Sequence, residues 1–138
     1  MMESVNTCNS GLFPIPYGCY CGPSDDDVSF DPVDAFDAAC LVHDNCYREA
    51  PEHGCRDQWD SWVKGYAFTV RDKEITCPAD QSECLRFICG CDKAVVEALV
   101  AESVNASCPD LFKPKKCPGK KESTAGKTIT NVLGSLFR

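Results

Sequence analysis

The sequence predicts a mainly α-helical domain held together by disulfide bonds, and three observations support this expectation. At 138 residues the chain fits one domain. Its 12 cysteines are an even number in a small body, which is typical of a disulfide scaffold. Two segments, one beginning near residue 32 and one near residue 82, repeat apolar side chains at the three- and four-residue steps of a helix face. We therefore expect one compact unit built on two helices.

The first part of the chain is expected to lack regular structure. Pro14 and Pro16 break any helix in residues 1–16. Residues 17–22, with the sequence YGCYCG, are rich in glycine and cysteine and indicate an ordered loop rather than a strand.

The first helix is expected to begin near Pro32. Asp31 suits the N-cap position, Pro32 the first helical position, and Asp34 the first turn. Residues at helical spacing then share one face, namely Val33, Phe36, Cys40, His43 and Tyr47. His43 therefore lies on the inward stripe, beside Asp44.

Pro51 and Gly54 end or interrupt this helix, and the boundary over residues 55–65 stays open. Residues 66–77 alternate around the polar stretch 71–74, which predicts a small β-hairpin. A second long helix is expected over about Ser82 to Ser103, with Asp92 on its otherwise apolar stripe. A carboxylate there is costly unless it has a partner.

Charge divides the chain into two parts. Residues 1–112 carry 7 basic and 20 acidic side chains, whereas residues 113–138 carry 7 basic and 1 acidic. The acidic body argues against a nucleic-acid partner and gives no help in binding anionic lipid, while the basic end could do the opposite. No cysteine follows Cys117, so we expect a domain over residues 1–117 and a flexible basic tail over residues 118–138.

Zinc binding is the competing explanation for so many cysteines. Zinc modules usually contain Cys-x-x-Cys pairs, but no two cysteines here are three positions apart. Disulfide bonds fit better, and they imply an oxidising compartment and hence a secreted, extracellular protein. Residues 1–8 lack the apolar core of a signal peptide, which we expect is removed or not shown.

His43, Asp44 and Asp92 form a candidate catalytic constellation. A bond between Cys46 and Cys91 would bring Asp92 within a turn of His43, so that the carboxylate could hold one imidazole nitrogen while the other acts as a base. Water is then the expected nucleophile. For His43 alone, a satisfied core histidine is the commoner explanation, but the surrounding acids and the glycine-containing loop favour catalysis.

Three blocks of sequence carry a resemblance to a known family. They are YGCYCG at residues 17–22, the helix over residues 37–47 that ends in HDNCY, and EITC at residues 74–77 followed by FICGCD at residues 87–92. Together they resemble secreted, calcium-dependent phospholipase A2 of the pancreatic and elapid-venom type. The resemblance runs from about Tyr17 to Ala98. It implies two long antiparallel helices cross-linked by disulfide bonds, with a small β-hairpin.

The resemblance also assigns roles. It makes His43 the general base, Asp92 its orienting carboxylate, and Asp44 the side-chain ligand of Ca²⁺. Tyr47 and Tyr66 would donate hydrogen bonds to Asp92. The backbone carbonyls of Tyr20, Gly22 and Ser24 would complete the calcium site, and the Gly22 amide would stabilise the oxyanion. The implied activity is hydrolysis of the sn-2 ester of glycerophospholipids in aggregates or at a membrane surface, by a monomer or a subunit of a larger complex.

Family pairings imply the disulfides Cys21–Cys40, Cys46–Cys91, Cys55–Cys84, Cys77–Cys89 and Cys19–Cys117. Cys8 and Cys108 then pair only by elimination. Ala39 and Ala98 stand where the family usually has two cysteines bonded to each other, so a whole disulfide is missing and no thiol is left over.

Other departures affect function. The loop has Pro23 and Ser24 where the family prefers glycine, the stretch from Gly22 to His43 is longer than usual, and the N-terminal helix is truncated or absent. These departures leave open an alternative function on the same scaffold. That alternative is a non-catalytic or weakly catalytic binding protein, such as a toxin component or a ligand of a receptor or matrix.

Overall fold

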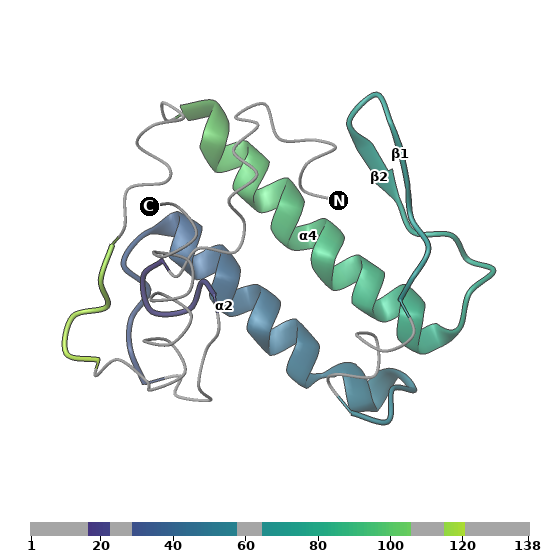
Figure 1. Cartoon of the computed structure of the whole chain (residues 1–138), viewed down its shortest axis with the longest axis horizontal. Helices are drawn as coiled ribbons and strands as arrows, with labels where there is room; N and C mark the ends of the chain where they lie inside the picture. The colour runs from purple at the N-terminus through teal and green to yellow at the C-terminus, as the bar shows by residue number, and fades with distance from the viewer. Residues whose placement is uncertain (1–16, 23–28, 58–64, 106–114, 121–138) are drawn as a thin grey trace, which may run out of the picture.

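Two long helices dominate the computed structural model, which describes residues 17–22, 29–57, 65–105 and 115–120. They are α2 (Ala35–Arg48) and α4 (Glu83–Asn105), and they lie side by side (Figure 1). Cys46 near the end of α2 is bonded to Cys91 near the start of α4, whereas Phe36 at the start of α2 packs against the cluster that contains Leu99. The helices therefore run antiparallel, and the predicted mainly helical fold is confirmed.

The start of α2 differs from the prediction. Asp34, not Asp31, is the N-cap: its backbone is extended (φ −163°, ψ −175°), and its side chain accepts a hydrogen bond from the Asp37 amide at 2.9 Å. The expected start at Pro32 was wrong because the Val33 amide donates to the Asp37 carboxylate and is not part of the helix. Pro32 therefore lies in the segment that leads into the cap.

The end of α2 agrees with the prediction that Pro51 and Gly54 interrupt the helix. After Arg48 the chain forms a short 3₁₀ helix, η1 (Ala50–His53), which contains Pro51. Gly54 ends it with φ 83°, a left-handed conformation that favours glycine. Residues 58–64, for which no boundary was predicted, lie outside the described residues.

The predicted hairpin is present as β1 (Thr69–Arg71) and β2 (Glu74–Thr76), which pair antiparallel with Val70 opposite Ile75. Asp72 and Lys73 form the turn with φ 51° and 65°, as a two-residue hairpin turn requires. Ile75 is buried against the apolar face of α4, in a cluster with Val95, Val96 and Leu99. The hairpin therefore covers one side of α4 (Figure 1).

Five disulfide bonds link the elements, and they are the five that the family pairings imply: Cys19–Cys117, Cys21–Cys40, Cys46–Cys91, Cys55–Cys84 and Cys77–Cys89. Cys8 and Cys108 lie outside the described residues. Two of the three buried clusters contain half-cystines of these bonds, whereas the third is formed by Ile75, Val95, Val96 and Leu99. The core is thus small and depends on its cross-links, as expected for a chain of this size.

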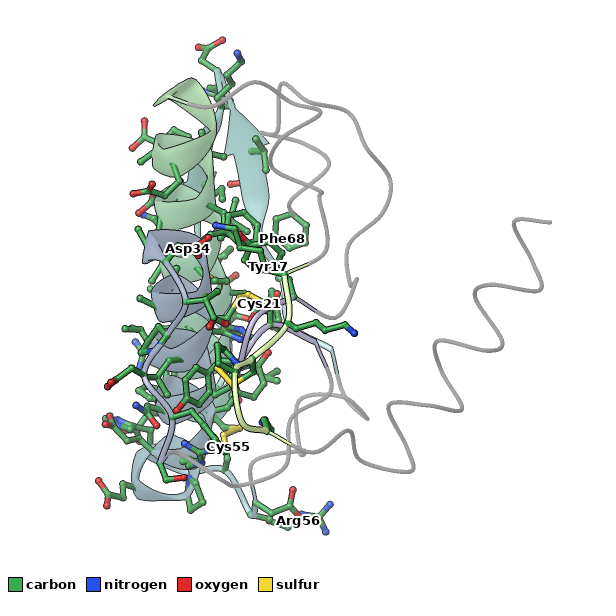
Figure 2. The ribbon with its side chains drawn as sticks, turned by 90° about the vertical axis from the view of Figure 1, so that its left-hand side faces the viewer. Tyr17, Cys21, Asp34, Cys55, Arg56 and Phe68 are labelled. Atoms are coloured by element: carbon green, nitrogen blue, oxygen red, sulfur yellow. A yellow bond between two sulfur atoms is a disulfide. The ribbon has the colours of Figure 1, made fainter. Side chains whose placement is uncertain are left out.

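The loop over residues 17–22 lies against the first turns of α2 (Figure 2). Its contacts are isolated bridges rather than a strand, between Tyr17 and Cys21 and between Gly18 and Lys116. None of the helices in the described ranges is both long enough and apolar enough to cross a membrane.

Candidate active site

The carboxylate of Asp92 is the meeting point of side chains from three parts of the fold. His43 Nε2 lies 2.7 Å from Asp92 Oδ1. The Tyr47 hydroxyl donates to the same oxygen at 2.8 Å, and the Tyr66 hydroxyl donates to Oδ2. The structure therefore brings together four of the residues that the sequence singled out, and it supplies the partners that a carboxylate on an apolar stripe requires.

Helix geometry and one disulfide explain why these groups meet. His43 and Tyr47 are four residues apart on α2, so they share a face, and their ring centroids are 4.6 Å apart. The Cys46–Cys91 bond, with its Cα atoms 5.8 Å apart, joins residues adjacent to Tyr47 and Asp92. The covalent link thus fixes the register of the two helices at the level of the site.

The site stabilises Asp92 as an anion. Burial alone would raise the pKa of Asp92, but hydrogen bonds from His43, Tyr66 and Tyr47 outweigh it, and the pKa falls below its ordinary value. Burial, and then the hydrogen bond to Asp92 and its charge, raise the pKa of Tyr66. Tyr66 therefore stays protonated as a donor, while Asp92 is ionised at neutral pH.

An ionised Asp92 determines which nitrogen of His43 can act as a base. A carboxylate accepts hydrogen bonds and has none to donate, so Nε2 must carry the proton of neutral His43. The lone pair then lies on Nδ1. The His43 side chain is 27% exposed, which leaves the ring accessible to a water molecule. This geometry is the one that a histidine general base requires, with one nitrogen held by a carboxylate and the other left for water.

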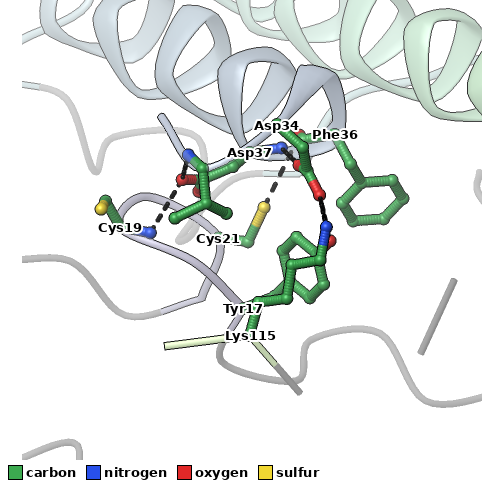
Figure 3. A network of polar contacts seen from close by, with 8 residues as sticks. Tyr17, Cys19, Cys21, Asp34, Phe36, Asp37 and Lys115 are labelled. Carbon is green, nitrogen blue, oxygen red and sulfur yellow. Dashed lines mark hydrogen bonds and ion pairs between the residues drawn. The ribbon is translucent and has the colours of Figure 1, made fainter. Parts of the chain in front are cut away.

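A second carboxylate, Asp37, organises the loop over residues 17–22. It is fully buried on α2 and accepts a hydrogen bond from the Cys19 amide at 2.8 Å (Figure 3). It also accepts from the amides of Tyr20 (2.8 Å) and Val33 (2.9 Å). Sequence reasoning did not assign Asp37 to the site. The spacing could have indicated its role, because Asp37 lies three residues before Cys40 and therefore on the helix face that contacts the loop.

Gly18 is required where the loop passes Asp37. Its φ of 61° is left-handed, and a Cβ atom there would lie 2.4 Å from Cγ of Asp37. A larger residue would therefore both strain the backbone and displace the carboxylate.

The loop is attached to α2 by Cys21–Cys40, whose Cα atoms are 5.1 Å apart. Asp44 follows Cys40 by four residues, so it lies on the same face of α2, about one turn further along. Cys21 N donates to the Tyr17 carbonyl at 3.1 Å. Because C=O and N–H of a trans peptide point in opposite directions, the Tyr20 carbonyl is directed away from Tyr17.

The calcium site expected from the sequence has oxygen donors only. Within the described ranges, no group of three or more His, Cys, Asp or Glu side chains is placed to hold a metal ion. A site made of backbone carbonyls and one carboxylate, as expected from Tyr20, Gly22 and Asp44, offers only the hard oxygen ligands that Ca²⁺ prefers. Ser24, the remaining expected ligand, lies outside the described residues.

Comparisons with known proteins show what the chain is similar to. The family model described as Phospholipase A2 matches residues 1–109. An acidic phospholipase A2, KBf-grIB, of Bungarus fasciatus is 38% identical over 97 residues, which are 66% of this chain and 66% of that protein. Acidic phospholipase A2 S17-58 of Austrelaps superbus is 36% identical over 120 residues, 85% of this chain and 77% of that protein.

A third relative is named as one chain of a toxin. The basic phospholipase A2 beta-bungarotoxin A1 chain of Bungarus flaviceps flaviceps is 42% identical over 77 residues, 56% of this chain and 48% of that protein. The family match covers well over half of the chain. The chain belongs to the phospholipase A2 family, whose members are hydrolases of phospholipid esters.

Proposed function

We propose that this chain is a calcium-dependent phospholipase A2, which hydrolyses the sn-2 ester of glycerophospholipids to a lysophospholipid and a free fatty acid. One observation carries the proposal: His43 Nε2 is held by Asp92, and Asp92 is itself held by Tyr47 and Tyr66. This arrangement leaves Nδ1 of His43 as the base for water.

Each residue around Asp92 has a defined task in this reaction. His43 Nδ1 takes a proton from water as the water oxygen attacks the ester carbonyl, and the same proton then passes to the departing alkoxide of the glycerol backbone. Asp92 stabilises the imidazolium that forms between the two steps. Tyr47 and Tyr66 keep the carboxylate aligned with the ring.

The calcium site is proposed on Asp44 and on the backbone carbonyls of Tyr20, Gly22 and Ser24. Bound there, Ca²⁺ would polarise the ester carbonyl as a Lewis acid. The Gly22 amide belongs to the same loop and would donate to the oxygen on which negative charge develops. The Asp37 contacts and the Cys21–Cys40 bond support this proposal, because they hold the loop to the helix that carries Asp44.

Phospholipid aggregates or a membrane surface are the proposed substrate, outside the cell. The five disulfides of the described chain support an extracellular location. The chain acts as a monomer or as a subunit of a larger complex, and the relative named as a chain of beta-bungarotoxin supports the second arrangement.

The test is a fatty-acid release assay with folded protein in millimolar calcium, on mixed micelles and on anionic vesicles. The proposal expects release that stops when a chelator removes calcium. The alternative, a binding protein on the same scaffold, is favoured by the long stretch from Gly22 to His43, which includes Pro23 and Ser24. Calcium binding without hydrolysis of any phospholipid tested would support that alternative.

A further inference from the structure

The segment over residues 115–120, which we call the C-terminal strap, lies along the loop over residues 17–22. The Gly18 amide donates to the Lys115 carbonyl at 2.8 Å, and Gly18 bridges to Lys116 in parallel. The Cys19–Cys117 bond joins the two segments covalently. These contacts continue beyond Cys117, where the sequence predicts the start of a flexible tail; residues 121–138 lie outside the described residues.

Lys115 gives the strap a further attachment at the start of α2. Its ammonium lies 2.6 Å from Asp34 Oδ2, to which the Tyr17 hydroxyl also donates (Figure 3). This ion pair lowers the pKa of Asp34 against the effect of burial. The strap is therefore fixed to both the loop and the helix cap.

Lys120 contacts the residue before Tyr20, one of the proposed calcium ligands. Its ammonium donates to the Cys19 carbonyl at 3.1 Å and lies 5.9 Å from the centre of the Tyr20 ring and 5.8 Å from that of Phe30. The other end of the same peptide group, the Tyr20 amide, donates to Asp37 at 2.8 Å. The Lys120 ammonium and the buried Asp37 carboxylate thus hold the Cys19–Tyr20 peptide group at its two opposite edges, one at the C=O and the other at the N–H.

We propose that Lys120 is a positioning residue for the calcium loop, and this inference rests on the proposed function. Lys120 and Asp37 fix the plane of the Cys19–Tyr20 peptide, and the Cys21 amide fixes the next plane by its bond to Tyr17. The Tyr20 carbonyl, a proposed calcium ligand, belongs to that second plane. The two planes meet at the Cα atom of Tyr20, so fixing the first plane restricts the backbone angles that orient the second. Lys120 therefore reduces the freedom of the carbonyl before calcium binds, which raises calcium affinity.

Electrostatic repulsion between the Lys120 ammonium and a bound cation would act in the opposite direction. In 0.1 M salt the screening length is about 10 Å, which weakens this repulsion. Repulsion alone predicts tighter calcium binding when the charge is removed, whereas positioning predicts weaker binding. The sign of the change on removing Lys120 therefore distinguishes the two effects.

The test compares calcium titrations of the full chain by isothermal calorimetry in 0.1 M salt. The variants are Lys120→Met, which removes charge and hydrogen bond, and Lys120→Arg, which keeps both. Lys116→Met is the matched control, because Lys116 is an exposed lysine of the same strap and loses the same charge. Far-UV circular dichroism and thermal unfolding in EDTA verify that each variant is folded.

The inference expects calcium binding about three- to tenfold weaker in Lys120→Met, within twofold of wild type in Lys116→Met, and restored in Lys120→Arg. Equal or tighter binding in Lys120→Met overturns the inference and leaves the proposed function intact. Folded wild-type protein that binds no calcium overturns the inference together with the calcium-dependent function. The wild-type titration distinguishes the two failures.

Discussion

His43 Nε2 and Asp92 Oδ1 lie 2.7 Å apart across the contact between α2 and α4. The neighbouring Cys46–Cys91 bond links the two helices beside the pair. Because the contact uses Nε2, Nδ1 is the nitrogen left for the base that we propose.

Replacement of Asp92 by Asn tests the orienting role of the carboxylate. We expect kcat to fall roughly 10²–10⁴-fold with a much smaller change in KM, because the amide cannot stabilise an imidazolium as a carboxylate does. Steady-state kinetics on mixed micelles would measure both constants. An unchanged kcat would show that Asp92 only supports the fold.

The Tyr66→Phe variant tests how far the tyrosines stabilise the anion. Loss of this donor leaves a mostly buried carboxylate with one partner fewer, so the pKa of Asp92 should rise and the free energy of unfolding should fall by about 1–3 kcal/mol. Urea unfolding at neutral pH would measure the second effect. A variant as stable as the wild type would mean that water replaces the hydroxyl at no cost.

Asp37→Asn tests the attachment of the loop. The carboxylate accepts three amide hydrogen bonds, whereas a carboxamide has a single acceptor oxygen and turns an NH₂ group toward N–H donors. We expect a loss of about 3 kcal/mol or more in the free energy of unfolding, together with weaker calcium binding. Asp80→Asn, an exposed turn position, should stay within about 0.5 kcal/mol of wild type. Similar losses in both variants would contradict the assigned role of Asp37.

From the lowered pKa of Asp34 we expect the free energy of unfolding to depend on pH. Burial raises its pKa, but hydrogen bonds from Lys115, Tyr17 and the Asp37 amide lower it overall, so its folded pKa is below the unfolded value of about 3.9. Its charge therefore stabilises the fold above about pH 5, and that contribution is lost as the pH falls through the lowered pKa.

The Asp34→Asn variant keeps a good N-cap and removes the charge. It should be less stable than wild type at neutral pH by no more than about 1 kcal/mol, because solvent screens the ion pair. The difference should shrink toward zero in strong acid. Chemical unfolding at a series of pH values measures it, and a difference that grows on acidification would oppose the assignment.

The parts of this architecture that depend on periodicity or on cysteines could be predicted. The spacing of His43 and Tyr47 placed them on one face, and the apolar stripe around Asp92 required a partner, which the structure supplies. The sequence did not indicate the Lys120 contact, because a hydrogen bond across 101 positions leaves no periodic signal. The start of α2 was missed because Asp31 and Asp34 are equally good caps, and only the buried Asp37 decides between them.

The most direct test of the central claim is release of the sn-2 fatty acid from a doubly labelled phospholipid by the wild-type chain and by His43→Gln, with calcium binding measured on both. The account predicts rapid, calcium-dependent sn-2 release by wild type, and a rate at least about 10²-fold lower in a variant that still binds calcium. Wild-type protein that releases no sn-2 fatty acid, or a variant that keeps the wild-type rate, would contradict it.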